Sequence, residues 1–184
     1  MEYLEGHPVN YILHKKGRIS PKNVAQLGVQ IAAGLDYAHQ RGIVHRDIKS
    51  ANLFFTHERM VKIMDFGLAK MMEEVRRGTT VIGGTPYYMA PEQAVGENVD
   101  HRADLYAFGV TLYELLTGKV PFAEGDVAYH HRHTSPQDPR QLVPEIPEAM
   151  ARLVLYMMEK RVEARCSSAA EAGASLQRLV PLIP

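Results

Sequence analysis

Cysteine is nearly missing from this sequence, because Cys166 is the only one in 184 residues. A single thiol cannot form an internal disulfide, so a disulfide framework is excluded and a reducing compartment is favoured. An excess of basic charge is also lacking, since 21 lysines and arginines balance 21 acidic residues. This balance argues against the strongly basic surface of a nucleic-acid-binding protein.

Long apolar runs are lacking as well. No stretch approaches the ~20 apolar residues of a membrane-spanning helix, so no membrane segment is expected. Residues 1–5 (MEYLE) do not show the basic-then-apolar pattern of a signal peptide. We therefore expect a soluble, cytoplasmic protein, or a soluble segment of a longer one. Its length suits one domain, for which ~100–200 residues is usual.

Two short polar motifs stand out from this background. The first covers residues 45–52 (HRDIKSAN) and the second residues 65–67 (DFG). Phosphoryl transfer from a nucleotide needs a carboxylate to orient the attacking hydroxyl, a cation for the γ-phosphate and oxygen ligands for Mg²⁺. In that order, the two motifs offer Asp47, Lys49, and Asn52 together with Asp65.

The segment between the two motifs predicts a β-hairpin. Residues 53–56 (LFFT) and 60–64 (MVKIM) are mainly apolar and flank the polar turn 57–59 (HER). An antiparallel hairpin returns the chain to its starting end. Asp65 is therefore expected beside Asn52, as a shared metal site requires.

At this spacing, the two motifs resemble the catalytic and metal-binding loops of serine/threonine protein kinases. Lys49, two residues after Asp47, is typical of the serine/threonine branch rather than the tyrosine branch. Residues 84–92 (GTPYYMAPE) closely resemble the substrate-docking loop of the same family, most of all in its bacterial-type members. Small-molecule phosphotransferases share an Asp…Asn loop but do not predict this downstream loop.

The resemblance covers nearly the whole chain and implies an α+β, mostly α-helical fold. This fold is the large (C-terminal) lobe of a protein kinase, with a small β-hairpin at the catalytic cleft. The implied reaction moves the γ-phosphate of ATP, with Mg²⁺ or Mn²⁺, to serine or threonine hydroxyls of protein substrates. Asp47 would accept the hydroxyl proton and Lys49 would neutralise the γ-phosphate. Asn52 and Asp65 would hold the metal ion.

Roles for residues outside the two motifs also follow from the resemblance. Residues 1–6 resemble the hinge between the kinase lobes, where the backbone of Glu2 and Leu4 would bind the adenine edge. Phe54, larger than the aliphatic residue common at this position, would lie beneath the base. Thr85 would hydrogen-bond the catalytic aspartate and lysine.

Three further residues are implied to be structural. Asp104 would hold the backbone of the loop that begins at His45, although a plain first-turn acid is the alternative. Glu92 would pair with Arg165. If that pair is exposed it contributes under ~1 kcal/mol, and if it is buried the loss of either partner costs several times more.

A regulatory phosphorylation site is implied as well. Arg46 and Lys70 would receive a phosphate on an activation-loop threonine, because a phosphate orders a segment by pairing with such a cationic cluster. The candidates are Thr79 and Thr80. The usual acceptor position holds Val81, so the choice between the two threonines stays open.

The domain organisation expected from the resemblance is a partial kinase domain over residues 1–184, with the hinge at 1–6 and the large lobe at 7–184. The Gly-rich loop, strand lysine and helix glutamate of a small lobe do not occur in the sequence. The missing lobe is therefore an expected partner. Two interpretations remain: a kinase whose fragment is weakly active or inactive alone, and a truncated lobe that binds partners without catalysis.

Hydrophobic periodicity predicts helices along the rest of the chain. The strongest pattern begins at Pro21 and ends before Gly42, and the other segments are 100–118, 146–156 and 168–179. His130, His131 and His133 could suggest a metal site. No cysteine or carboxylate grouping nearby completes four ligands, so a solvated helix and loop is favoured there.

Overall fold

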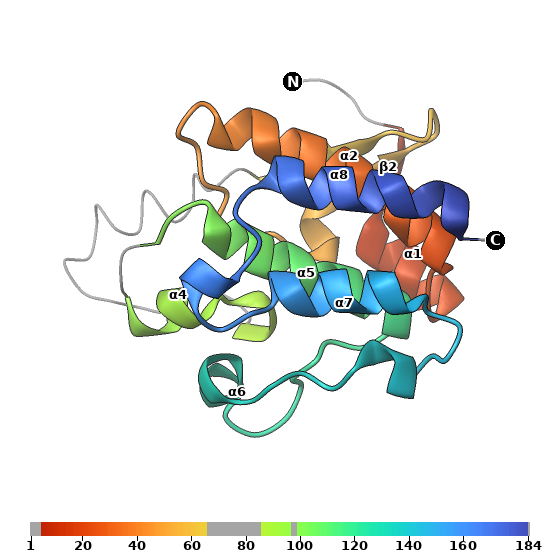
Figure 1. Cartoon of the computed structure of the whole chain (residues 1–184). Helices are drawn as coiled ribbons and strands as arrows, with labels where there is room; N and C mark the ends of the chain where they lie inside the picture. The colour runs from red at the N-terminus through yellow and green to blue at the C-terminus, as the bar shows by residue number, and fades with distance from the viewer. Residues whose placement is uncertain (1–4, 66–85, 97–98, 184) are drawn as a thin grey trace.

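The structure is a computed structural model that describes residues 5–65, 86–96 and 99–183 (Figure 1). This part of the chain is mainly helical and holds one three-stranded antiparallel sheet. The predicted α+β, mostly helical class is confirmed. The helices are α1 (Val9–Lys16), α2 (Pro21–His39), α4 (Pro91–Val95), α5 (Arg102–Thr117), α6 (Val127–His133), α7 (Glu148–Met157) and α8 (Ala169–Leu179).

The sheet has the order β1-β2-β3. Its strands are β1 (Gly6–Pro8), β2 (Leu53–Thr56) and β3 (Val61–Ile63), and short 3₁₀ turns are η1 (Ser50–Asn52), η2 (Pro86–Tyr88), η3 (Pro139–Gln141), η4 (Val162–Ala164) and η5 (Val180–Leu182). The predicted hairpin is β2 and β3, with Leu53 opposite Ile63. Strand β1 was not predicted: three residues including Pro8 carry no strand pattern, and they are extended because β2 offers them a ladder.

Helix α5 forms the centre of the molecule. Figure 1 shows it running between the pair α2 and α8 on one side and α7 on the other. Its side chains are buried nearly all round, as the apolar sequence 104–116 predicts. The helix ends at Gly118, whose φ of 77° and close approach to the Gly17 carbonyl exclude a side chain. A buried central helix is a rigid support for the loops attached to it.

The longest helix, α2, delivers the chain to the first motif. Val24, Ile31, Leu35 and Ala38 are buried along one stripe of it, as predicted. The residues then turn through Gly42, which takes the left-handed conformation with a φ of 72°. The helices predicted at residues 146–156 and 168–179 match the bounds of α7 and α8 to within two residues. No helix in the described ranges is long and apolar enough to span a lipid bilayer.

A buried ion pair joins α4 to the segment before α8. Arg165 Nη1 donates to Glu92 Oε1 at 2.8 Å, and Nη2 donates to Oε2 at 3.1 Å. The side chains are 0% and 7% exposed, respectively. Arg165 also donates to the carbonyl oxygens of Arg102 and Glu159. This arrangement satisfies the guanidinium in a site that water does not reach.

We predict that Arg165→Met lowers the free energy of unfolding by about 3–5 kcal/mol, because it leaves the Glu92 carboxylate buried without its counter-charge. Urea denaturation followed by circular dichroism measures this change. The matched control is Arg152→Met, which breaks the exposed pair with Glu148 and should cost less than about 1 kcal/mol. Equal losses in the two variants would contradict the prediction.

Candidate active site

His45 opens the first motif and joins it to the chain that precedes Asp65. Its Nε2 lies 2.8 Å from the carbonyl oxygen of Met64, and its Nδ1 accepts from the backbone N–H of Asp47 at 3.2 Å. Because a carbonyl oxygen only accepts, Nε2 must carry the proton. The Met64 N–H in turn donates to the Asn52 carbonyl at 2.8 Å. Met64 is thus tied to both ends of the loop, and Asp65 follows it.

Three predicted site residues converge inside this loop. Lys49 Nζ donates to Asp47 Oδ2 at 2.8 Å, and Asn52 Nδ2 donates to the same oxygen at 3.1 Å. A second bond from Asn52 Nδ2 to the Asp47 carbonyl, at 2.7 Å, closes the turn. The Asp47 side chain keeps 40% of its exposure, so its carboxylate is oriented by two donors while it stays open to a ligand.

A pair of oxygen ligands for a metal ion remains after these bonds are made. Asn52 uses its amide nitrogen on Asp47, which leaves Oδ1 as its only atom suited to a hard cation. Asp65 is exposed and has a φ of 54°. Mg²⁺ commonly takes one or two protein oxygens and completes its shell with water and phosphate. The donor types therefore fit Mg²⁺.

The histidines at positions 130, 131 and 133 can be compared with the metal site considered for them in the sequence. The described residues contain no group of three histidine, cysteine or acidic side chains that could hold a metal ion. Among the three histidines noted in the sequence, His131 is fully buried in α6, whereas His133 is exposed. Residues 127–133 form a helix, as the favoured interpretation expected, but His131 belongs to the core and is not solvated.

Asp104 fixes the backbone at the start of the loop. Its carboxylate, in a residue that is 1% exposed, accepts from the backbone N–H groups of His45 (2.8 Å) and Arg46 (2.7 Å). His39 Nε2 lies 2.9 Å from the same carboxylate. Arg46 has a φ of 66°, a conformation that costs a residue with a side chain about 1–3 kcal/mol. The hydrogen bonds to Asp104 hold it there.

A second support for Arg46 comes from the docking loop. Gln93 Nε2 donates to the Arg46 carbonyl at 3.2 Å, and Gln93 Oε1 accepts from the Ala90 N–H at 3.0 Å. One side chain therefore bridges the two loops. The sequence analysis missed Gln93. The only sequence signal for it is its position at the third residue of α4, where glutamine commonly reaches back to the helix start.

Glu114 of α5 lies between the same two loops and was also missed. Burial raises the pKa of its carboxyl group, while the nearby hydroxyls of Ser50 and Tyr88 lower it. Among the described residues, nothing hydrogen-bonds its buried Oε2. Burial, followed by the charge of Glu114, also raises the pKa of Tyr88. Ser50 follows Lys49, so this cluster connects the catalytic loop to the docking loop.

Among the residues predicted to bind the nucleotide, Phe54 lies in the described part of the chain. A Cβ atom placed on Gly6 would come within 3.0 Å of the Phe54 ring, so Phe54 lies against the end of the predicted hinge. The predicted residues that lie outside the described ranges are Glu2, Leu4, Lys70, Thr79, Thr80 and Thr85.

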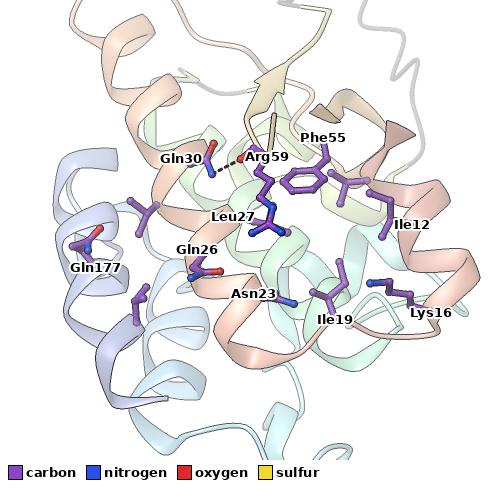
Figure 2. Close-up of a pocket in the computed structure, with 13 residues that line it drawn as sticks. Ile12, Lys16, Ile19, Asn23, Gln26, Leu27, Gln30, Phe55, Arg59 and Gln177 are labelled. Carbon is purple, nitrogen blue, oxygen red and sulfur yellow. Dashed lines mark hydrogen bonds between the residues drawn. The ribbon is translucent and has the colours of Figure 1, made fainter. Parts of the chain in front are cut away.

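A groove of about 700 Å³ lies apart from the predicted site residues (Figure 2). Phe55 lines it, on the opposite face of β2 from Phe54. Gln30 of α2 reaches the hairpin beside this groove, where its Nε2 donates to the Arg59 carbonyl at 3.2 Å and its Oε1 accepts from the Val61 N–H at 2.9 Å. These bonds fix the hairpin to α2 and so help to place Asp65.

We predict that Asp104→Asn lowers the free energy of unfolding by about 3 kcal/mol, because the amide removes the charge and brings an N–H group toward other donors. Urea titration measures the loss. The control is Asp36→Asn, which alters a carboxylate of α2 that accepts from the Gln40 side chain one turn along the same helix, and should change stability by less than about 0.5 kcal/mol. A negligible effect at Asp104 would show that it is an ordinary first-turn acid.

Glu114→Gln should change how stability depends on pH. Because the folded-state pKa of Glu114 is raised above its ordinary 4.5, the folded chain holds this proton more tightly than the unfolded chain. The protonated Glu114 carboxyl group therefore adds to the free energy of unfolding. This stabilisation is complete below pH 4.5 and is lost as the pH rises through the folded-state pKa. The variant should therefore gain stability relative to the parent as the pH rises from 4.5. Parallel stability curves, measured by urea unfolding at each pH, would rule this out.

Comparison with known proteins agrees with this geometry. A family model for the protein kinase domain matches residues 1–175. The chain is 41% identical over 184 residues to a probable serine/threonine-protein kinase of Streptomyces coelicolor, an alignment that covers 96% of this chain and 27% of the relative. Serine/threonine-protein kinase PknB of Mycolicibacterium smegmatis is 37% identical, with coverages of 97% and 30%.

A probable serine/threonine-protein kinase of Clostridium acetobutylicum is 38% identical over 175 residues, with coverages of 93% and 27%. The chain thus spans less than a third of the length of each of these relatives, all of them bacterial. The resemblance to bacterial-type kinases seen in the motifs is confirmed. The chain belongs to the protein kinase domain family.

Proposed function

We propose that the protein containing this chain transfers the γ-phosphate of ATP to serine or threonine hydroxyls of protein substrates. The observation that carries the proposal is the convergence of Lys49 and Asn52 on one oxygen of Asp47, at 2.8 and 3.1 Å. In phosphoryl transfer the protein contributes mainly positioning and charge compensation. A carboxylate held by two donors and open to solvent is suited to orient a substrate hydroxyl.

Each residue of the loop has a distinct part in this proposal. Asp47 orients the hydroxyl and accepts its proton through the carboxylate oxygen that its neighbours leave available. Lys49, already within 2.8 Å of Asp47, carries the positive charge that offsets the γ-phosphate. Thr85 hydrogen-bonds Asp47 and Lys49 from the docking loop and completes their orientation.

Nucleotide and metal binding involve the other predicted residues. Asn52 Oδ1 and the Asp65 carboxylate hold Mg²⁺ or Mn²⁺, which neutralises charge that develops on the phosphates. The backbone of Glu2 and Leu4 binds the adenine edge, and Phe54 lies beneath the base. Phe54 narrows the base pocket compared with a smaller aliphatic residue.

Regulation of the activity is proposed to act through Arg46. A phosphate on Thr79 or Thr80 pairs with Arg46 and Lys70 and thereby orders the segment between the catalytic and docking loops. Asp104 and Gln93 hold the strained backbone of Arg46, so the Cα atom that carries the Arg46 side chain has a fixed position. A cytoplasmic location stays a prediction based on the single cysteine.

The domain organisation is part of the same proposal. Residues 1–6 form the hinge and residues 7–184 the large lobe, and a small lobe that supplies the Gly-rich loop is its partner. The second candidate function is a non-catalytic lobe that binds protein partners.

The test is Mg²⁺-dependent transfer of ³²P from labelled ATP to a protein rich in serine and threonine. It is measured with this chain alone and with the chain extended upstream to include a small lobe. We expect transfer by the extended form, and a loss of ~10²–10⁴-fold in Asp47→Asn, as for other general bases. Asp36→Asn, a surface carboxylate of α2, should retain full activity.

Three outcomes separate the alternatives. Equal rates for Asp47→Asn and the parent would overturn the assignment of Asp47. No transfer by either form, with Mg²⁺ or Mn²⁺, would favour the binding module. Equal activity of the short and extended forms would show that the small lobe is not needed.

A further inference from the structure

A line of buried side chains joins the docking loop to three distant segments. His131 of α6 places Nε2 3.1 Å from the carbonyl oxygen of Tyr87 in η2. The opposite ring nitrogen, Nδ1, lies 2.9 Å from the hydroxyl of Tyr106 in α5. Lys160, which follows α7, donates from Nζ to that same hydroxyl at 3.1 Å. These contacts connect residues that are 25 to 54 positions apart in the sequence.

One arrangement of protons satisfies every contact in this line. The Tyr87 carbonyl only accepts, so His131 Nε2 carries a proton and donates it. In the neutral ring Nδ1 is then an acceptor, so the Tyr106 hydroxyl donates to it. The Tyr106 oxygen accepts from the Lys160 ammonium group, which can only donate hydrogen bonds. Each group therefore fixes the role of the next.

The protonation state of His131 agrees with this arrangement. Burial, helped by the charge of Lys160, lowers the pKa of the His131 ring to about 4. The ring is therefore neutral at physiological pH, as an accepting Nδ1 requires. Burial likewise lowers the pKa of Lys160 to about 8, with a further contribution from Arg165, which leaves the ammonium as the main form at neutral pH.

Packing fixes the orientation of the His131 ring. His131 and Tyr106 are both 0% exposed. The Phe122 ring meets the His131 ring edge-on, with centroids 5.1 Å apart and planes at 87°. Lys160 Nζ lies 4.9 Å from the centroid of the same Phe122 ring. A buried polar network with all of its partners in place selects one conformation, so the position of the Tyr87 carbonyl is defined.

The docking loop is thereby held at two consecutive residues. Tyr88 lies near Glu114 and Ser50, on the path to the catalytic loop, whereas Tyr87 is held by His131. Neither contact reaches Asp47, Lys49 or a nucleotide. The His131 contact therefore acts first on how the loop receives a polypeptide, and it has no direct contact with the groups proposed to carry out the chemistry.

We propose that His131 is a positioning residue for protein-substrate binding: its Nε2–H fixes the Tyr87 carbonyl of the docking loop, and Tyr106 with Lys160 maintains the tautomer that allows it. This rests on the proposed function, because the loop receives substrate only if the protein phosphorylates other proteins. A residue that acts on the loop alone should change the KM for a protein substrate. The KM for ATP should stay as it is, and kcat should fall by a smaller factor than the one by which the KM for the protein substrate rises.

The first test measures the loop without requiring activity. In His131→Leu, amide hydrogen exchange of residues 86–96, followed by mass spectrometry, should be about fivefold to tenfold faster, as expected for the loss of one buried hydrogen bond. His131→Gln retains a donor at the end of its side chain and should restore slow exchange. His133→Leu makes the same change at an exposed position of α6 and should leave exchange unchanged.

Global unfolding is separated from loop release by exchange in α2 and α7, which should be the same in all three variants. Uniformly faster exchange throughout His131→Leu, or unchanged exchange at residues 86–96, would overturn the proposal. If His131→Leu does not fold, Tyr106→Phe is used instead. It removes one hydroxyl from the line of buried side chains and should make amide hydrogen exchange at residues 86–96 faster. ¹⁵N spectra of the native imidazoles must also show the Nε2–H tautomer for His131, and an Nδ1–H tautomer would refute the arrangement.

The second test uses kinetics of the form that transfers phosphate. His131→Leu should raise the KM for a protein substrate by about the same fivefold to tenfold as the exchange rate. The KM for ATP should be unchanged, kcat should fall by a smaller factor than the one by which the KM for the protein substrate rises, and His131→Gln should recover the parent KM. A fivefold to tenfold fall in kcat, with an unchanged KM for the protein substrate, would contradict a positioning role. If no form transfers phosphate, the proposed function fails, whereas the exchange experiment still decides whether His131 holds the loop.

Discussion

A buried carboxylate that accepts hydrogen bonds from two consecutive backbone N–H groups is the constraint on which the candidate site depends. Asp104 receives the N–H groups of His45 and Arg46, and His39 adds a third contact. An ionised carboxylate is costly to bury unless such partners satisfy it. Here the partners are the backbone at the start of the catalytic loop, so the cost of burial is offset only when the loop has this conformation. The left-handed backbone of Arg46 is maintained in the same way.

The consequences of this constraint extend along the loop. Once His45 is fixed, its ring binds the Met64 carbonyl and the Asp47 N–H. Met64 precedes Asp65, and its N–H binds the Asn52 carbonyl. The two motifs are thus connected through backbone groups, while Lys49 and Asn52 orient the Asp47 carboxylate within the loop. Rigid backbone with oriented side chains is what catalysis by positioning requires.

Helix α5 supports both loops from the core. Its otherwise apolar surface carries Asp104 toward the catalytic loop, Tyr106 toward His131, and Glu114 toward Ser50 and Tyr88. Asp104 and Tyr106 are buried and Glu114 is half-buried, and each reaches a different segment. The docking loop and the catalytic loop are therefore both held in place by side chains of α5. Gln93 adds a direct bridge between them.

Spacing in the sequence predicted those parts of the site that are local in the chain, whereas the distant contacts of Asp104 with His45 and of Glu92 with Arg165 were expected only from the family resemblance. Asp47, Lys49 and Asn52 fall within six residues, and a short hairpin explains the approach of Asp65, so spacing alone was informative. The roles of Gln93, Glu114 and His131 were missed because each contacts a residue far away in the sequence, such as Arg46, which is 47 positions from Gln93, and Tyr87, which is 44 positions from His131. Nothing in the local sequence marks such pairs. Strand β1 and helix α1 were missed for a related reason: their stability comes from β2 and the core, not from their own pattern.

The position of a bound metal ion relative to both motifs is the most direct test of whether the two loops form one site. Mn²⁺ added with a non-hydrolysable ATP analogue broadens the NMR signals of nearby amides, and the backbone signals of residues 47–52 and of Asp65 can be followed in one titration. We predict that both sets broaden together, and that Asp65→Asn weakens the effect at both. Broadening at only one motif, or an unchanged titration in Asp65→Asn, would contradict the convergence of the two loops on a shared cation.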